Sequence, residues 1–148
     1  MRQLAALLLF LCSMTMSAED YTPAQEALRS RISAFLRSEG YKPEMQDDGL
    51  KFKDDGTTYY VEIDSNNEDP MYLSLSTYLA YEGNHTREKM AKRLNKCNVK
   101  YAVKVRCLKS SIVVASEMFL TKASQFTDAF SSMFSQLKSG VELVEEED

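Results

Sequence analysis

The sequence predicts an α+β domain in the order α-β-β-β-α-β-β-α, with a five-stranded antiparallel sheet and helices packed mainly on one face. Apolar residues recur every third or fourth position near the ends of the chain and every second position between them, as helices and half-buried strands require. The connections between neighbouring strands are short enough for antiparallel pairing. With 148 residues, 44% hydrophobic and 27% charged, the composition is typical of one globular domain.

The first 18 residues have the layout of a secretory signal peptide. Arg2 precedes the apolar run Leu4–Cys12, and small and polar residues follow up to Ala18. The apolar core, roughly 13 residues long, is shorter than the ~20 residues that a membrane-spanning helix needs. We therefore expect an exported protein, periplasmic or extracellular, with residues 1–18 removed and no stable membrane span after cleavage.

Residues 22–39 are predicted to form the first helix. Thr22 suits the N-cap, Pro23 the first helical position, and Gln25 completes a capping box with Thr22. Gly40 follows as the stop signal. One face of this helix carries the apolar residues Leu28, Ile32, Phe35 and Leu36.

The chain then alternates with period two, which predicts a three-stranded meander. Leu50–Lys53 and Tyr59–Asp64 flank the turn signal Asp54-Asp55-Gly56. A loop over Ser65–Pro70 is expected to lead into a third strand, Met71–Tyr78.

A second helix over 84–97, strands over 99–107 and 112–120, and a last helix over 121–138 complete a single domain, residues 19–140. The acidic tail, 141–148, is expected to fray. The last helix carries an aromatic stripe that is expected to be core, or else a dimer seam: Phe126, Phe130 and Phe134.

Two cysteines lie in the mature chain, Cys97 and Cys107. We expect both to be reduced and mostly buried, behaving as small hydrophobic residues. A disulfide would require the helix that carries Cys97 to fold back toward the following strand, because a bridge needs short Cα separations.

Three segments resemble the YbjN family, which has the type III secretion chaperone-like fold: Phe35–Tyr41, Asp47–Phe52 and Tyr59–Asp64. The order of elements is similar over nearly the whole mature chain. The resemblance implies a compact, often dimeric, non-enzymatic module that binds another protein or serves a regulatory or stress role. The predicted signal peptide departs from secretion chaperones, which work in the cytoplasm.

Motifs for catalysis or metal binding are missing from the sequence. The chain has one histidine, His85, and no Gly-x-Ser-x-Gly, Cys-x-x-Cys or Gly-rich phosphate loop. The stretch that begins at Asp64 imitates a calcium loop, but Asp69 and Leu75 stand where Gly and a bidentate Glu are required. We predict a protein that is not an enzyme, with no catalytic residues, no metal ligands and no cofactor.

The non-core face of the sheet is the candidate surface for a partner. Aromatic and arginine side chains among small residues are favoured at protein interfaces, although a solvated face with isolated aromatics is an alternative. The net charge of -4 and the expected export argue against nucleic acid as the partner. The residues predicted to bind a partner are Tyr60, Tyr72, Tyr78, Lys100, Lys104 and Arg106.

Charge is divided unevenly along the chain. Residues 40–69 hold nine acidic and three basic residues, whereas residues 86–109 hold nine basic residues and one acidic residue. Such a division can steer a charged partner or let two copies dock acid to base.

We predict an exported, non-enzymatic binding module, chaperone-like or regulatory, which captures a protein or peptide partner and forms a homodimer. The alternative is a periplasmic small-ligand sensor or hydrolase with a pocket between the helices and the sheet.

Overall fold

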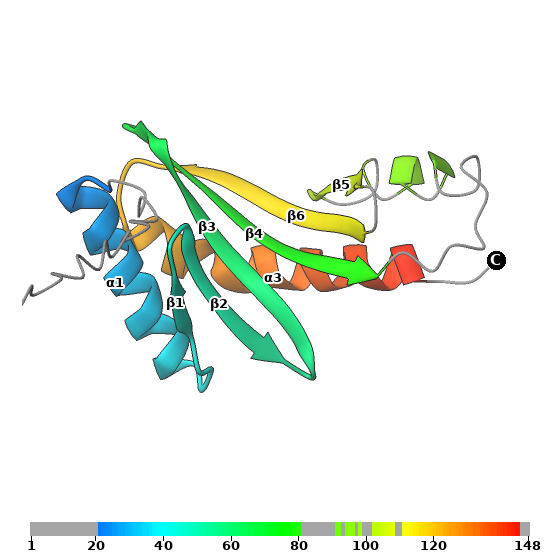
Figure 1. Cartoon of the computed structure of the whole chain (residues 1–148), viewed down its shortest axis with the longest axis horizontal. Helices are drawn as coiled ribbons and strands as arrows, with labels where there is room; N and C mark the ends of the chain where they lie inside the picture. Colours follow the sequence, from blue (N-terminus) through cyan, green and yellow to red (C-terminus); the bar gives the residue numbers. More distant parts are fainter. Residues whose placement is uncertain are drawn as a thin grey trace, which may run out of the picture.

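The structure, a computed structural model, describes residues 21–80, 91–92, 94–96, 98, 102–108 and 111–145. Helix α1 (Pro23–Ser38) comes first and helix α3 (Ser124–Glu145) last (Figure 1), and residues 91–92, 94–96 and 98 are also helical. The strands between them are β1 (Glu44–Gln46), β2 (Gly49–Asp54), β3 (Thr57–Glu68), β4 (Met71–Ala80), β5 (Lys104–Cys107) and β6 (Ser111–Leu120). The predicted signal peptide lies outside the described residues.

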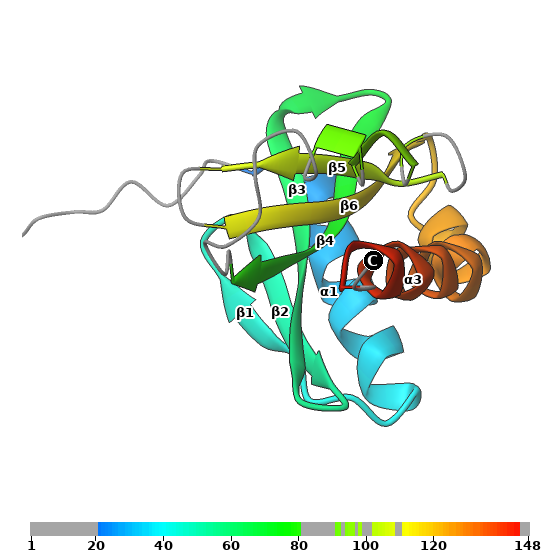
Figure 2. The same ribbon diagram turned by 90° about the vertical axis from the view of Figure 1, so that its right-hand side faces the viewer.

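The strands form one antiparallel sheet in the order β1-β2-β3-β4-β6-β5. Figure 2 shows α1 and α3 on the same side of this sheet. The α+β class and the antiparallel sheet are therefore confirmed. The one-sided pattern is confirmed at Val61 and Leu73, which are fully buried.

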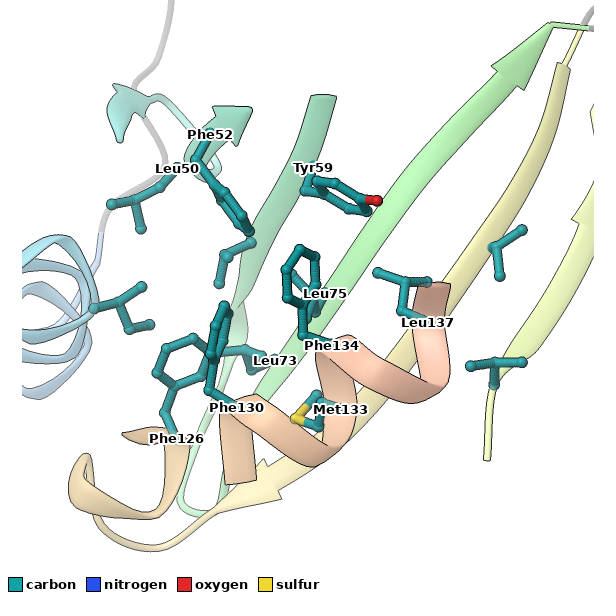
Figure 3. Packing of buried hydrophobic residues seen from close by; sticks show 14 of the residues in the cluster. Leu50, Phe52, Tyr59, Leu73, Leu75, Phe126, Phe130, Met133, Phe134 and Leu137 are labelled. Atoms are coloured by element: carbon teal, nitrogen blue, oxygen red, sulfur yellow. The ribbon is translucent and has the colours of Figure 1, made fainter. Parts of the chain in front are cut away.

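Aromatic and aliphatic side chains fill the layer between helices and sheet. Figure 3 shows Phe130 and Phe134 of α3 pointing at the side chains of β2, β3 and β4. The ring of Phe134 lies 4.8 Å from that of Tyr59, edge to face, and 5.3 Å from that of Phe130. The stripe at Phe126, Phe130 and Phe134 is therefore core, as expected.

The start of α1 is attached to the far end of the β3–β4 hairpin by one buried side chain, Gln25. Its Oε1 accepts a hydrogen bond from the Thr22 backbone N–H at 2.9 Å, which closes the predicted capping box. Its Nε2 donates to the carbonyl oxygens of Asp64, Ser65 and Asn67 at 3.1–3.3 Å. The cap therefore also positions the hairpin.

The sheet has six strands rather than the predicted five. The extra strand, β1, has three residues and no buried apolar side chain, so it carries no alternating pattern. Strand β3 also continues to Glu68 through a register irregularity after Ile63, where a loop over Ser65–Pro70 was expected. Strand β5 begins at Lys104, later than the predicted strand over 99–107.

The last helix runs to Glu145, beyond the predicted end at 138, and this changes the expectation for the acidic tail. Val141, Leu143 and Val144 are buried. Their apolar spacing continues the buried face of α3. The burial of these side chains stabilises the helix although acidic residues lie next to them. Residues 146–148 lie outside the described part of the chain.

Cys107 is a free and exposed thiol, so the expectation that it is buried is wrong. The residue ends β5, the outermost strand of the sheet, where few neighbours can cover it. Cys97 lies outside the described residues.

The two glutamines near the helix starts allow a matched test. Gln25→Ala leaves three carbonyl groups without a shared donor and should lower the free energy of unfolding by about 2–3 kcal/mol. Gln125 accepts from the backbone N–H groups of Thr121 and Lys122, but it is exposed, so Gln125→Ala should cost about 1 kcal/mol at most. Urea unfolding of both variants measures the difference, and equal costs would contradict the proposed attachment.

Candidate partner-binding surface

The face of the sheet opposite α1 and α3, called the open face below, gathers side chains from five strands. The strand register places Tyr60 beside Lys51 and Ser76, and Ala115 beside Ser76 and Lys104. Small buried residues, among them Ser76 and Ala115, form its floor. The large side chains of the open face are Tyr60, Glu62, Tyr72, Tyr78, Lys104, Arg106, Glu117 and Phe119.

Two aromatic pairs stand apart on this face. Tyr60 and Tyr78 meet edge to face with their ring centroids 5.3 Å apart, and Tyr72 and Phe119 form a tilted pair at 5.2 Å. Phe119 is 61% exposed and Tyr78 is 44% exposed. Each pair therefore combines a partly covered ring with one that is open to a partner.

Charged side chains occupy the region between the aromatic pairs. Glu117 forms an ion pair with Lys104 and accepts a hydrogen bond from the Tyr72 hydroxyl. The Tyr78 hydroxyl lies 3.5 Å from Glu62 Oε1, at the limit of a hydrogen bond. Arg106 forms no ion pair with any described residue, but its positive charge lies near the carboxyl groups of Glu62 and Glu117 and favours their ionised forms.

These groups surround a shallow hollow of about 340 Å³ lined by Glu62, Asp64, Tyr72, Arg106 and Glu117. Burial, with Asp48 nearby, raises the pKa of the Glu62 carboxyl. In contrast, hydrogen bonds from Asn66 lower the pKa of Asp64. Four carboxyl groups line the hollow, those of Asp48, Glu62, Asp64 and Glu117, against the single base Arg106, so its lining is predominantly acidic.

The structure brings together five of the six predicted binding residues: Tyr60, Tyr72, Tyr78, Lys104 and Arg106. The sixth, Lys100, lies outside the described residues. The prediction missed Glu117 and Phe119, although alternation along β6 from Val113 would have placed both on this face. It also missed Glu62, which alternates with buried Val61 and Ile63.

In the described part of the chain, no group of three or more His, Cys, Asp or Glu residues is placed to hold a metal ion. No described helix is long and apolar enough to cross a membrane.

The fold is similar to the crystal structure of YbjN, a candidate transcription regulator from E. coli. The superposition has a TM-score of 0.59 and 16% sequence identity, and it covers 83% of this chain and 90% of YbjN. This similarity shows that the chain has the YbjN fold and confirms the resemblance seen in the sequence at that level. No protein-family profile matches the sequence, and no curated protein matches it.

Titration of Tyr72 tests the geometry of the open face. Burial, followed by the hydrogen bond to Glu117, raises the pKa of the Tyr72 hydroxyl from 10.0 to about 12. Because the folded state holds this proton more tightly than the unfolded state, the contribution to stability is complete below pH 10 and is lost as the pH rises through about 12. The difference in phenolate absorbance between the wild type and Tyr72→Phe should have its midpoint at about 12.

Glu117→Gln provides the control for this titration. Removing the carboxylate charge should bring the Tyr72 midpoint closer to 10.0, the ordinary tyrosine pKa. A wild-type midpoint already near 10.0 would show that Tyr72 is not held against Glu117.

Proposed function

We propose that this chain is a non-enzymatic binding module that captures an extended segment of another protein on the open face, in a chaperone-like or regulatory role. The observation that carries the proposal is the exposure of Phe119 and Tyr78 on a face that neither α1 nor α3 covers. Exposed aromatic residues beside an arginine are typical of the residues that dominate binding energy at protein interfaces.

Each part of the open face would have a distinct role in capture. The Tyr72–Phe119 and Tyr60–Tyr78 pairs would hold apolar side chains of the segment. The contacts of Glu117 with Tyr72 and Lys104 hold the intervening surface in place before binding, which reduces the entropy that binding costs.

Export and a regulatory role are two further features of the proposal. The signal-like residues 1–18 support an exported protein, periplasmic or extracellular, in which capture takes place after their removal. The regulatory role is supported by the shared fold with YbjN, itself a candidate regulator. Fold similarity alone does not identify the partner.

The alternative of a sensor or hydrolase with a pocket between helices and sheet is less favoured, because the hollow that α3 shares with β2 and β3 has about 140 Å³, below the roughly 300–1,000 Å³ of small-molecule sites. Core side chains occupy that layer where Figure 3 displays it, and Phe52, Phe126 and Leu137 are fully buried within it.

A peptide selection tests capture on the open face. A displayed library of random peptides, selected on the wild-type protein, should yield binders that lose at least about tenfold in affinity for Phe119→Ser or Tyr78→Ser. Both side chains are exposed, so thermal stability should remain nearly unchanged. Binding is measured by fluorescence anisotropy.

Met45→Ser is the matched control for that selection. Met45 is 46% exposed, like Tyr78, but lies on β1, far along the sheet from β6. The selected peptides should bind this variant as they bind the wild type. Peptides that bind all three variants equally, or a library that yields no binder, would rule out the open face as the capture surface.

Association between copies is the second part of the proposal. Acidic residues concentrate in the segment of β1, β2 and β3, at one end of the strand order. Strand β5, at the other end, contributes Lys104 and Arg106. The mature chain, residues 19–148, should therefore be a homodimer whose dissociation constant rises with ionic strength. Light scattering at low and high salt measures this, and a monomer at both salt concentrations would contradict it.

A further inference from the structure

A second hollow lies beside β2, near the end of the strand order that is opposite β5. Strand β1 pairs only with Gly49, Leu50 and Lys51 of β2, whereas β3 pairs with the whole strand. The chain that precedes β1 does not pair with β2 beyond Lys51. A pocket of about 620 Å³ lies beside this part of β2. This volume lies within the range of about 300–1,000 Å³ that small-molecule sites occupy.

The cationic groups of this pocket come from an otherwise acidic part of the sequence. Residues 40–69 contain only three basic residues, Lys42, Lys51 and Lys53, and all three line the pocket. Glu44 neutralises Lys51 through an ion pair at 2.9 Å. Lys42 and Lys53 are exposed and pair with no carboxylate among the described residues. Among the described residues, no carboxylate therefore pairs with either of these two positive charges at the pocket.

Aromatic rings supply the apolar part of the lining. Tyr41 packs against Phe52 with a centroid distance of 4.9 Å and meets Phe134 edge to face at 6.1 Å. Tyr60 is held by its edge-to-face contact with Tyr78. These contacts fix the rings before any ligand arrives, which gives a largely pre-formed wall.

We propose that this pocket binds a small organic anion in which an aromatic ring carries a phosphate or carboxylate group. The ring would lie against Tyr41 and Tyr60, and the anionic group would be held by Lys42 and Lys53, since lysine binds phosphate as a point charge. The Thr58 hydroxyl, also in the lining, offers a further hydrogen bond. This site does not include Phe119 or Arg106, although it shares Tyr60 with the open face.

Three probes separate the contributions of ring and charge. Isothermal titration calorimetry with phenyl phosphate, inorganic phosphate and phenol should give the tightest binding for phenyl phosphate, because only this probe uses both parts of the pocket. The double variant Lys42→Gln/Lys53→Gln should bind phenyl phosphate at least about tenfold more weakly. Lys122→Gln, which removes an exposed lysine outside the pocket, should leave binding unchanged.

Several outcomes would overturn the proposal. The proposal is wrong if phenyl phosphate binds no more tightly than inorganic phosphate, or if the double variant binds phenyl phosphate as the wild type does. Tighter binding of a tetraglutamate peptide than of phenyl phosphate would assign the pocket to an acidic protein segment instead. Both lysines are exposed, so the double variant should fold, and its circular dichroism checks this. The single variant Lys53→Gln provides a second measurement, and it should lose less affinity for phenyl phosphate than the double variant.

Discussion

One-sided burial of the sheet is the constraint on which the structure depends. Alternate residues of β2, β3, β4 and β6 point at α1 and α3, and the aromatic residues of α3 fill the space between the layers. Because the side-chain period of a strand is two, a shift of one residue in the pairing would move this entire apolar set to the opposite face. The same register that buries Tyr59 and Val61 therefore presents Tyr60 and Glu62 on the open face. The core and the candidate binding surface therefore both depend on the same strand register.

The two candidate sites suit different ligands because their surroundings differ. The hollow beside Tyr72 mixes carboxylates with Arg106 and lies between two aromatic pairs, an arrangement that fits a long partner with varied side chains. The pocket beside β2 combines aromatic rings with Lys42 and Lys53, which pair with no carboxylate in the described part of the chain. Tyr60 belongs to both surfaces, since it lines the pocket and contacts Tyr78. A ligand that moved Tyr60 would therefore also disturb the aromatic pair on the open face.

Periodicity predicted most of the architecture and most of the candidate surface. It located α1, the β2–β3 hairpin and the tyrosines of the open face, because each depends on spacing that neighbouring residues already display. Strand β1 was missed because three exposed residues carry no pattern and pair only once β2 exists. The end of α3 was missed because acidic residues near Leu143 outweighed its apolar spacing, which only tertiary burial reveals. The sequence did not predict the basic pocket either. Lys42 and Lys53 are separated in sequence, and they line one pocket only because the chain before β1 does not pair with the end of β2.

The contacts of Gln25 have a consequence for the order in which the chain assembles. They join residues separated by 39 to 42 positions, and a helix of 16 residues is only marginally stable by itself in water. The hydrogen bonds of Gln25 can form only once Asp64, Ser65 and Asn67 at the end of β3 are in place. Residues 21–40 of a growing chain would thus lack this attachment until β3 has been synthesised. The N-cap of α1 is therefore completed by a strand that follows the helix in the sequence.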